Sequence, residues 1–309
     1  MNEQKKAGTL YIFSAYLLWG LFPIYWKMLE HVTAHEILAN RVLWSFVSMA
    51  LLLLFTRKLG ALKATLRTMK EKPKQAAALV TASFLVSGNW FLFIWAINND
   101  RVIETSLGYY INPLMSVLLG VFVLKESLSK AQIVSVFFAA VGVAVLTIAY
   151  GQLPWISLGL AVTFALYGLM KKTVQVEAAV GLTLETFSVT PIAVGFLIYW
   201  GTKAELSLFS GSLSTDLLLM IGGAVTALPL LLFAEGAPKI PLSMIGILQY
   251  ITPTMTLLLG VFAYHEPFTV TQLISFSFIW VALVIFTFSQ TKWYQKRQFI
   301  MDKHEKGSA

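Results

Sequence analysis

The stretch YINPLMSVLLGVFVLKE at positions 110–126 recurs as YITPTMTLLLGVFAYHE at positions 250–266. Between 107–147 and 247–287, 15 of 41 aligned residues are identical, all with the same shift of 140 positions. The identities include tyrosine, proline, glycine and glutamate in register, which a biased composition alone does not produce. A repeat of this length predicts that the chain consists of two similar halves.

The composition indicates a membrane protein. Of the 309 residues, 57% are hydrophobic and 12% are charged, whereas a soluble domain carries about a quarter charged residues. A helix needs about 20 mostly apolar residues to cross the hydrocarbon core. Ten segments qualify, at 8–27, 36–56, 76–97, 104–123, 131–149, 154–171, 180–200, 215–234, 241–263 and 270–290. We therefore expect an all-α membrane protein with ten transmembrane helices, whose longest inner loop is 57–75.

The distribution of lysine and arginine predicts the orientation. With the N-terminus inside, 19 of the 23 basic residues fall in inside segments, Lys27, Arg101 and Lys203 fall outside, and Arg41 lies within the second span. Because basic residues concentrate in cytoplasmic loops, both termini are expected in the cytoplasm. The net charge of +8 then reflects contact with the inner leaflet of the bilayer rather than nucleic-acid binding.

Five spans in each half give the two halves opposite orientations in the membrane. We divide the chain into an N-terminal repeat, 1–150, a C-terminal repeat, 151–291, and a polar cytoplasmic tail, 292–309. Inverted repeats are typical of secondary transporters, whose substrate site lies near the midplane between the halves. The pattern therefore favours a transporter that works by alternating access, although an inverted repeat does not exclude a channel or a non-transporting scaffold.

Several classes of chemistry have no signature in this sequence. The chain has no cysteine, so it has no disulfide, no thiol nucleophile and no cysteine-based metal site. It also lacks a phosphate-binding loop, a His-Glu-x-x-His motif and a Gly-x-Ser-x-Gly motif. We therefore expect no cofactor, no metal and no ATP-driven step within this chain, and a membrane-embedded enzyme is disfavoured.

The repeated helix end, GVFVLKE at 120–126 and GVFAYHE at 260–266, over ten spans resembles the EamA family of the drug/metabolite transporter superfamily. Further segments look like its RarD branch, namely 19–20, 36–45, 89–90, 96–98, 163–169 and 226–233. The resemblance covers nearly all of the chain. It implies a multi-pass permease of the bacterial inner membrane, usually an exporter of small metabolites.

Arg41 is the strongest candidate for substrate binding, because an ionisable residue inside a membrane is costly. It lies about a turn and a half after Glu36, and Trp44 follows nearly one turn later on the same face. One hypothesis is that Arg41 anchors an anionic or carboxylate-bearing substrate. The alternative is a structural pair with Glu36 or with helix carbonyls, or a side chain that reaches the outer surface.

Two carboxylates inside predicted spans are candidates for coupling transport to protons. Glu185 lies early in span seven, and Glu235 lies at the inner end of span eight. The alternatives are structural. Glu185 would then lie at the membrane interface or pair with Lys171 or Lys172, and Glu235 would be held at the inner interface near Lys239.

Two pairs of residues are related by the repeat. Pro113 and Pro253 each remove a helical hydrogen bond, and their matched positions favour a shared bend with a role in gating. Glu126 and Glu266 follow the repeated helix, and we interpret them as structural, capping the next helix across the loop.

A set of aromatic and amide side chains is the candidate lining of a substrate cavity, because such cavities combine flat apolar walls with a few polar groups. With Arg41, the set is Trp44, Asn89, Trp90, Tyr110, Asn112, Tyr167, Gln249 and Tyr250. The alternative is that the amides bond between helices. Tyr25, Trp26 and Trp200, near helix ends, are expected in the interfacial aromatic belts.

Overall fold

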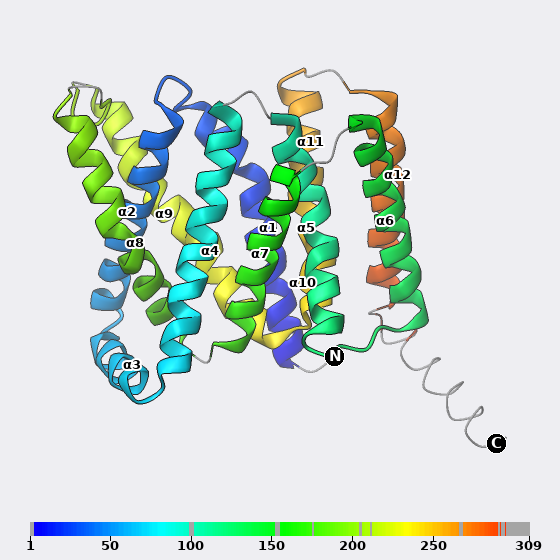
Figure 1. The fold of residues 1–309 in the computed structure, drawn as a ribbon, viewed down its shortest axis with the longest axis horizontal. Helices are drawn as coiled ribbons and strands as arrows, with labels where there is room; N and C mark the ends of the chain where they lie inside the picture. Colours follow the sequence, from blue (N-terminus) through cyan, green and yellow to red (C-terminus); the bar gives the residue numbers. More distant parts are fainter. Residues whose placement is uncertain are drawn as a thin grey trace.

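The computed structural model describes residues 3–98, 102–151, 155–174, 176–203, 206–210, 212–265, 268–289, 291 and 294. Within these ranges the chain is a bundle of long helices and contains no strand (Figure 1). Glu266 and the tail 292–309, except Tyr294, lie outside the described residues.

The long helices agree closely with the predicted spans. The first half contains α1 (Glu3–Lys27), α2 (Ala34–Phe55), α4 (Pro73–Asn98), α5 (Val102–Phe122) and α6 (Lys130–Tyr150). The second half contains α7 (Trp155–Thr173), α8 (Ala178–Gly201), α9 (Leu213–Gly236), α10 (Leu242–Gln249), α11 (Ile251–Leu258) and α12 (Val270–Ser289). A 3₁₀ turn, Ala237–Lys239, joins α9 to α10, and a π-helical turn, Leu259–Ala263, follows α11.

Among the described residues, eight helices are long and apolar enough to cross a membrane. Two other helices, α5 and α7, run beside them in the bundle (Figure 1) but do not meet this criterion of length and apolar character over their described residues. The described apolar part of α5 is Leu107–Phe122, and α7 carries Lys171 and Lys172 in its last turn. The all-α membrane fold is confirmed, and the count of ten crossings stays a prediction.

Counterpart helices of the two halves run in opposite directions. Ser135 Oγ on α6 donates to the Ala282 carbonyl on α12, and Ser275 Oγ on α12 donates to the Gly142 carbonyl on α6, both at 2.7 Å. The two serines are repeat partners, as are Gly142 and Ala282. Because the contacting residue numbers rise along one helix and fall along the other, α6 and α12 are antiparallel and related by an approximate two-fold axis.

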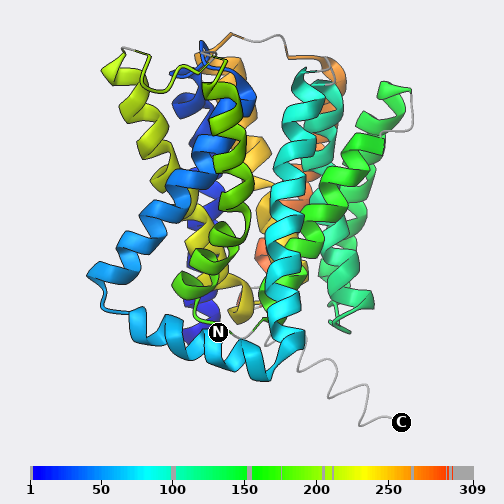
Figure 2. The same cartoon turned by 60° about the vertical axis from the view of Figure 1, so that its left-hand side comes forward.

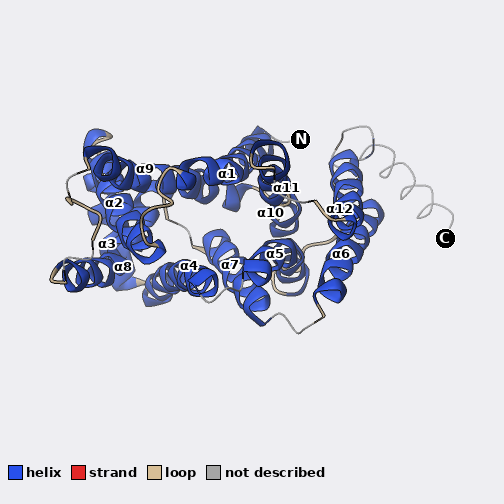
Figure 3. Ribbon diagram, turned by 90° about the horizontal axis from the view of Figure 1, so that it is seen from above, coloured by secondary structure: helices blue, strands red, loops and turns tan. Residues whose placement is uncertain are grey.

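The helices of the two halves are interleaved. α2 packs on α8 and α9, α1 packs on α9 and α11, and both α4 and α5 pack on α7. When the bundle is viewed along its helices, α2, α9, α1 and α11 form one layer, and α8, α4, α7 and α5 form the other. Helices α6 and α12 lie at one end of these two layers (Figure 3). The apolar core is therefore built jointly by both halves.

Glu126 connects the two halves at the end of the bundle where α1 begins. Its carboxylate accepts hydrogen bonds from the backbone N–H of Leu242 at 2.6 Å and of Ser243 at 2.9 Å, in the first turn of α10. We expected it to cap the next helix, α6, but Ser129 and Gln132 close that N-terminus with their own capping box. Glu126 caps α10 instead because α10 lies antiparallel to α5.

The two repeated prolines stand in helices that differ in continuity, and the shared bend that we expected stays a prediction. α5 continues through Pro113, whereas its counterpart is broken at Tyr250, so that α10 ends at Gln249 and α11 starts at Ile251. The break lies one turn before Pro253, which has no N–H to donate to the Gln249 carbonyl. The proline therefore permits the break, and packing in each half decides whether it occurs. The proposed role in gating stays a prediction.

The stretch 57–75, which we predicted as a loop, is mostly helical. Helix α3 (Leu59–Glu71) crosses the end of the bundle between α2 and α4 (Figures 1 and 2). Its apolar residues recur at helical spacing, but its lysines and arginine keep it out of any search for membrane spans. The prediction was wrong because only spans, and not surface helices, were sought.

Candidate functional site

A close crossing of α2 and α9 creates the site. A Cβ atom on Gly223 would collide with the backbone of Trp44 and Ser45, so only glycine allows this approach. Ser45 Oγ donates to the Gly223 carbonyl at 2.9 Å and fixes the crossing. Arg41, one turn before Ser45, is thereby placed beside Thr226, which lies nearly one turn after Gly223.

Arg41 is held by a hydroxyl and two indole rings. Its Nε donates to Thr226 Oγ1 at 3.1 Å. The guanidinium carbon lies 4.8 Å from the ring centre of Trp26 and 4.9 Å from that of Trp90, within the range of cation–π attraction. No carboxylate among the described residues forms an ion pair with Arg41.

Glu36, the structural partner that we considered for Arg41, is engaged elsewhere. Its fully buried carboxylate accepts hydrogen bonds from the backbone N–H of Ser207, at 2.9 and 3.0 Å, and from that of Leu208, at 2.8 Å. These donors satisfy the carboxylate without a cation. The structural alternative of an Arg41–Glu36 pair is therefore excluded.

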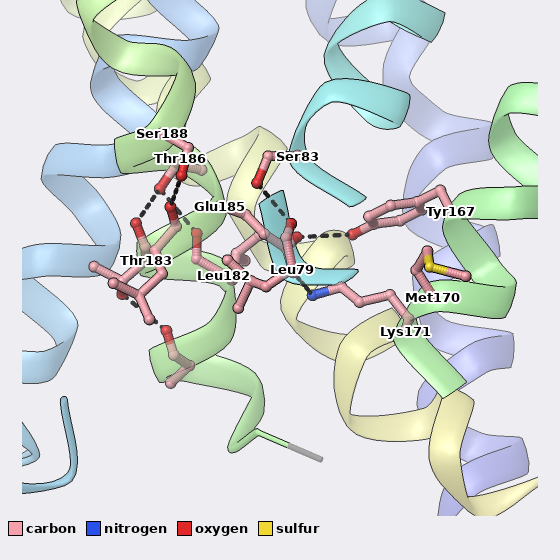
Figure 4. Close-up of polar contacts among 12 residues, drawn as sticks. Leu79, Ser83, Tyr167, Met170, Lys171, Leu182, Thr183, Glu185, Thr186 and Ser188 are labelled. Carbon is pink, nitrogen blue, oxygen red and sulfur yellow. Dashed lines mark hydrogen bonds and ion pairs between the residues drawn. The ribbon is translucent and has the colours of Figure 1, made fainter. Parts of the chain in front are cut away.

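A buried ion pair lies between α7 and α8. Lys171 Nζ donates to Glu185 Oε1 at 2.6 Å, and the two side chains are 7% and 4% exposed. The Tyr167 hydroxyl lies 3.5 Å from the other carboxylate oxygen (Figure 4). Of the alternatives for Glu185, pairing with Lys171 is the one present. The role of Glu185 in coupling stays a prediction.

A small cavity adjoins this ion pair. Its volume is about 20 Å³, and Trp90, Tyr167 and Glu185 line it together with Ser87, Thr186 and apolar residues of α2, α4, α8 and α9. This is room for roughly one water molecule, and too little for an organic solute. Trp90 lines this cavity and also contacts the guanidinium of Arg41. It therefore connects the surroundings of Arg41 with those of Glu185.

Tyr110 and Tyr250, the repeat partners, meet away from this cavity. The Tyr250 hydroxyl donates to the Tyr110 carbonyl at 3.1 Å, and the Tyr110 ring packs edge-on against Phe276 with the ring centres 5.1 Å apart. The contact joins the middle of α5 to the point where α10 ends and α11 begins. At this position the contact between the two tyrosines is better suited to stabilising the break between α10 and α11 than to binding a solute.

Two other expected lining residues are engaged in contacts with their own or neighbouring helices. Asn89 Nδ2 donates to the Leu160 carbonyl and to Thr163 Oγ1, both at 2.8 Å, and so ties α4 to α7. Trp44 Nε1 donates to Asn40 Oδ1 at 3.2 Å, within α2. The structure therefore favours the helix-packing alternative for Asn89 and does not bring Trp44 to the Arg41 guanidinium.

The remaining expected residues are dispersed. Asn112 accepts a hydrogen bond from Ser116 at 3.4 Å within α5. Gln249 is buried, and its Oε1 has no hydrogen-bond partner among the described residues. Glu235 pairs with Lys239 at 3.0 Å at the end of α9, where its side chain is 39% exposed. This pairing is the structural alternative that we considered for Glu235.

Sequence reasoning missed two residues that contact Arg41. Trp26 was expected in the interfacial belt, but its ring rests against Gly222 and faces Arg41. Thr226 was quoted only as part of a family segment. The adjacent glycines 222–223 were the available signal, because paired small residues mark a close helix contact. They do not reveal which helix makes that contact.

Sequence reasoning also missed an aromatic cluster between α1, α7 and α9. Tyr167 stacks on Phe233 with ring centres 5.8 Å apart, and Trp19 contacts Phe164 and Phe233 at 5.8 and 5.9 Å. Tyr16 packs edge-on against Phe233 at 6.2 Å. Phe233 follows Thr226 by seven residues on α9, so the cluster lies about 10 Å further along the bundle than Arg41.

Comparison with known proteins identifies the family. A model of the EamA-like transporter family matches residues 6–148. The uncharacterized transporter YojE of Bacillus subtilis strain 168 is 51% identical over 292 residues, which cover 94% of this chain and 97% of that protein. The chain belongs to the EamA-like transporter family. Protein RarD of Salmonella typhi and of Escherichia coli K12 are 43% and 40% identical, each over 92% of this chain and 95% of RarD, consistent with the RarD-type branch of the family.

A solved structure matches the fold. A crystal structure of another protein superposes with a TM-score of 0.71, covering 92% of this chain and 97% of that chain at 18% sequence identity. At this identity the match concerns the fold alone. The EamA-like family and the named relatives support a multi-pass membrane transporter.

Proposed function

We propose that this EamA-like protein is a secondary transporter that exports a small organic solute across the bacterial cytoplasmic membrane by alternating access. The observation that carries the proposal is Arg41, a cation inside the bundle that contacts two indole rings and a hydroxyl but no carboxylate among the described residues. Such an arrangement is suited to a ligand that brings the missing negative charge.

The substrate chemistry follows from the groups around Arg41. Guanidinium presents its donors in a plane that matches a carboxylate, and the flanking faces of Trp26 and Trp90 offer apolar surface to the rest of a solute. The proposed substrate is therefore a small carboxylate with an apolar or aromatic body. Trp90 extends from this group to the cavity beside Glu185.

Alternating access is supported by what closes one end of the bundle. The aromatic cluster of Tyr16, Trp19, Phe164, Tyr167 and Phe233 lies between Arg41 and the end where α1 begins, which the charge distribution assigns to the cytoplasm. On this proposal the cluster is the inner gate in its closed state. The repeats 1–150 and 151–291 would exchange conformations to open it, with both termini and the tail 292–309 in the cytoplasm. The family match at residues 6–148 supports this division.

Glu185 is the proposed coupling residue. Its carboxylate is almost fully enclosed with Lys171 and adjoins a cavity with room for about one water molecule. A proton delivered there would remove one charge of the pair and loosen the contact between α7 and α8. Glu235 is the lesser candidate, because it is more exposed and its pair with Lys239 lies within one helix end.

Counterflow in proteoliposomes tests the proposed substrate chemistry. The purified protein is reconstituted with a panel of aromatic and aliphatic carboxylates, each compared with its neutral primary amide. We expect saturable counterflow of a carboxylate and at least about tenfold slower counterflow of its amide, because the amide cannot pair with Arg41. Uptake that never saturates and shows no counterflow would indicate a pore. Equal transport of acid and amide would remove Arg41 as the anchor.

The absence of cysteine permits a direct test of the inner gate. Tyr109, in the first half of α5, is 41% exposed, whereas Phe233 is fully buried. Tyr109→Cys and Phe233→Cys, each as a single cysteine, are labelled with a membrane-impermeant maleimide added to the outer side of intact cells. We expect Tyr109→Cys to react and Phe233→Cys to stay protected until substrate is added. Equal labelling of both positions without substrate would contradict a closed gate at the aromatic cluster.

A further inference from the structure

Helix α3 differs from every other long helix in its orientation. It lies across the end of the bundle, at the level where α2 ends and α4 begins (Figures 1 and 2). It contacts only α4 and α8 closely, and none of its residues is fully buried. The helix is therefore attached to the bundle along one side, and its other side is free.

The free side of α3 combines leucines with lysines. Leu59, Lys63, Leu66 and Lys70 follow one another at intervals of four, three and four residues, so they share one stripe along the helix. Leu59 and Leu66 are 43% and 44% exposed. Leu62, on the adjoining face, packs against the core. A stripe of this kind has no partner within the described protein.

Exposed apolar side chains of α2 precede this stripe along the chain. Leu51, Leu54 and Phe55, at the end of α2 next to α3, are exposed by 46%, 54% and 78%. In a membrane protein such side chains face hydrocarbon. The leucines of α3 follow shortly after them along the chain, so we expect them at the depth where hydrocarbon gives way to headgroups. Apolar side chains at that depth indicate lipid rather than a dissolved ion as the neighbour.

The charge around α3 is strongly positive. The segment 57–74 contains seven lysines and arginines and one acidic residue, Glu71. Arg67 lies 3.6 Å from Glu71. Lys63 and Lys70 form no ion pair among the described residues and flank the exposed leucines. Long lysine side chains of this kind reach from a leucine stripe to the phosphate layer.

We propose that α3 is an in-plane helix that binds anionic phospholipid headgroups of the cytoplasmic leaflet. Leu59 and Leu66 enter the acyl boundary, and Lys63 and Lys70 bind the phosphates above it. Amphipathic helices with basic flanks bind membranes in this way. A free phosphate ion would satisfy the lysines but would leave the leucines in water.

One contact joins this surface to the helix that carries Glu185. Lys58, at the start of α3, forms an ion pair with Glu177, immediately before α8. The hydrogen bond from Lys58 to Glu177 raises the pKa of Lys58 above its ordinary value. Lipid binding by α3 would therefore position the start of α8, whichever solute the protein transports.

A single fluorophore tests the proposal, since the chain has no cysteine of its own. Leu66→Cys is labelled with an environment-sensitive dye in nanodiscs of phosphatidylcholine alone or with about one-third phosphatidylglycerol. Quenchers attached to the lipid chains report how much dye is buried. We expect a blue shift and stronger quenching in the anionic discs, both reduced by high salt because salt screens the lysines.

Two double variants, each lacking two lysines, complete the test. Lys63→Gln with Lys70→Gln should abolish the difference between the two lipids, at about fivefold in partitioning per lysine. Lys125→Gln with Lys130→Gln removes two exposed lysines from the same end of the bundle and should leave the difference intact. Dye exposed to water in both lipids, equal burial in both, or equal loss in the two double variants would overturn the proposal. Unchanged thermal unfolding of both variants confirms that they are folded.

Discussion

Arg41 and Glu185 lie equally far along the second long helix of their halves but have opposite charges and different partners. Each is the eighth residue of the second long helix of its half, counted from Ala34 in α2 and from Ala178 in α8. Arg41 is held by two indole rings and a hydroxyl. Glu185 is held by a lysine.

The comparison indicates that, in a duplicated protein, functional residues are to be sought where the two copies differ. Where the copies agree, as at Ser135 and Ser275, they build the scaffold through reciprocal hydrogen bonds. Where they differ, one half carries a cation without a carboxylate and the other a balanced ion pair. We infer that the first charge is available to a substrate, whereas the second stabilises the protein until a proton removes it.

Removing Lys171 should give the largest effect on stability. Lys171→Met leaves Glu185 as an unbalanced buried charge, and we expect the free energy of unfolding to fall by about 3–5 kcal/mol. Thermal unfolding of the detergent-purified protein measures this. Lys171→Met combined with Glu185→Gln should recover most of the loss, because a neutral pair needs no counter-charge. A double variant as unstable as the single one would show that charge balance is not what holds α7 to α8.

Removing Arg41 should impair transport more than stability. Arg41→Ala is expected to slow counterflow at least about 100-fold, or roughly 2.7 kcal/mol, since the substrate loses its anchor. Its unfolding temperature should change far less than that of Lys171→Met, because no buried carboxylate is left unpaired. Arg41→Lys keeps the charge but loses the planar contact with the indoles, so its rate should be intermediate. Normal counterflow by Arg41→Ala would refute the contrast between the two charges.

Glu126 provides a carboxylate that is held mainly by backbone N–H groups. Glu126→Ala removes the cap of α10 and should cost about 2 kcal/mol of unfolding free energy. Glu126→Gln keeps one oxygen acceptor and should cost less. Glu71→Ala, which removes an exposed carboxylate, is the matched control and should change stability by less than about 1 kcal/mol. A loss from Glu126→Ala no larger than this control would show that the cap does not stabilise α10.

Tyr250→Phe measures the smallest of these effects. It removes the neutral hydrogen bond from Tyr250 to the Tyr110 carbonyl and should cost about 1 kcal/mol. The exposed Tyr199→Phe is the control, with no change expected. If Tyr250→Phe matched Lys171→Met in stability loss, charge would not be what distinguishes the Glu185 region.

The fold was largely predictable because membrane spans carry a strong hydropathy signal. The spans, their approximate ends and the opposite orientation of the repeats all followed from residue patterns. Helix α3 did not, since its leucines are diluted by lysines. The break at Tyr250 did not either, because the same proline leaves α5 intact, and only tertiary packing distinguishes the two copies.

The site was predictable in its charges but not in their surroundings. Arg41 was identified because an arginine inside a span is unusual, and Lys171 was a considered partner of Glu185. Trp26 and Thr226 were not connected with Arg41, because they come from α1 and α9. Their contact depends on how closely α2 crosses α9 at Gly223, a distance that no residue pattern specifies.

The interleaving of the helices has a consequence for how the protein is made. α2 packs mainly on α8 and α9, which the ribosome delivers more than 120 residues later. Arg41 therefore enters the bilayer before Thr226 exists to bind it. The nascent first half is therefore incompletely packed in the membrane until the second half has been synthesised. During that time lipid headgroups or the insertion machinery must bind the guanidinium of Arg41.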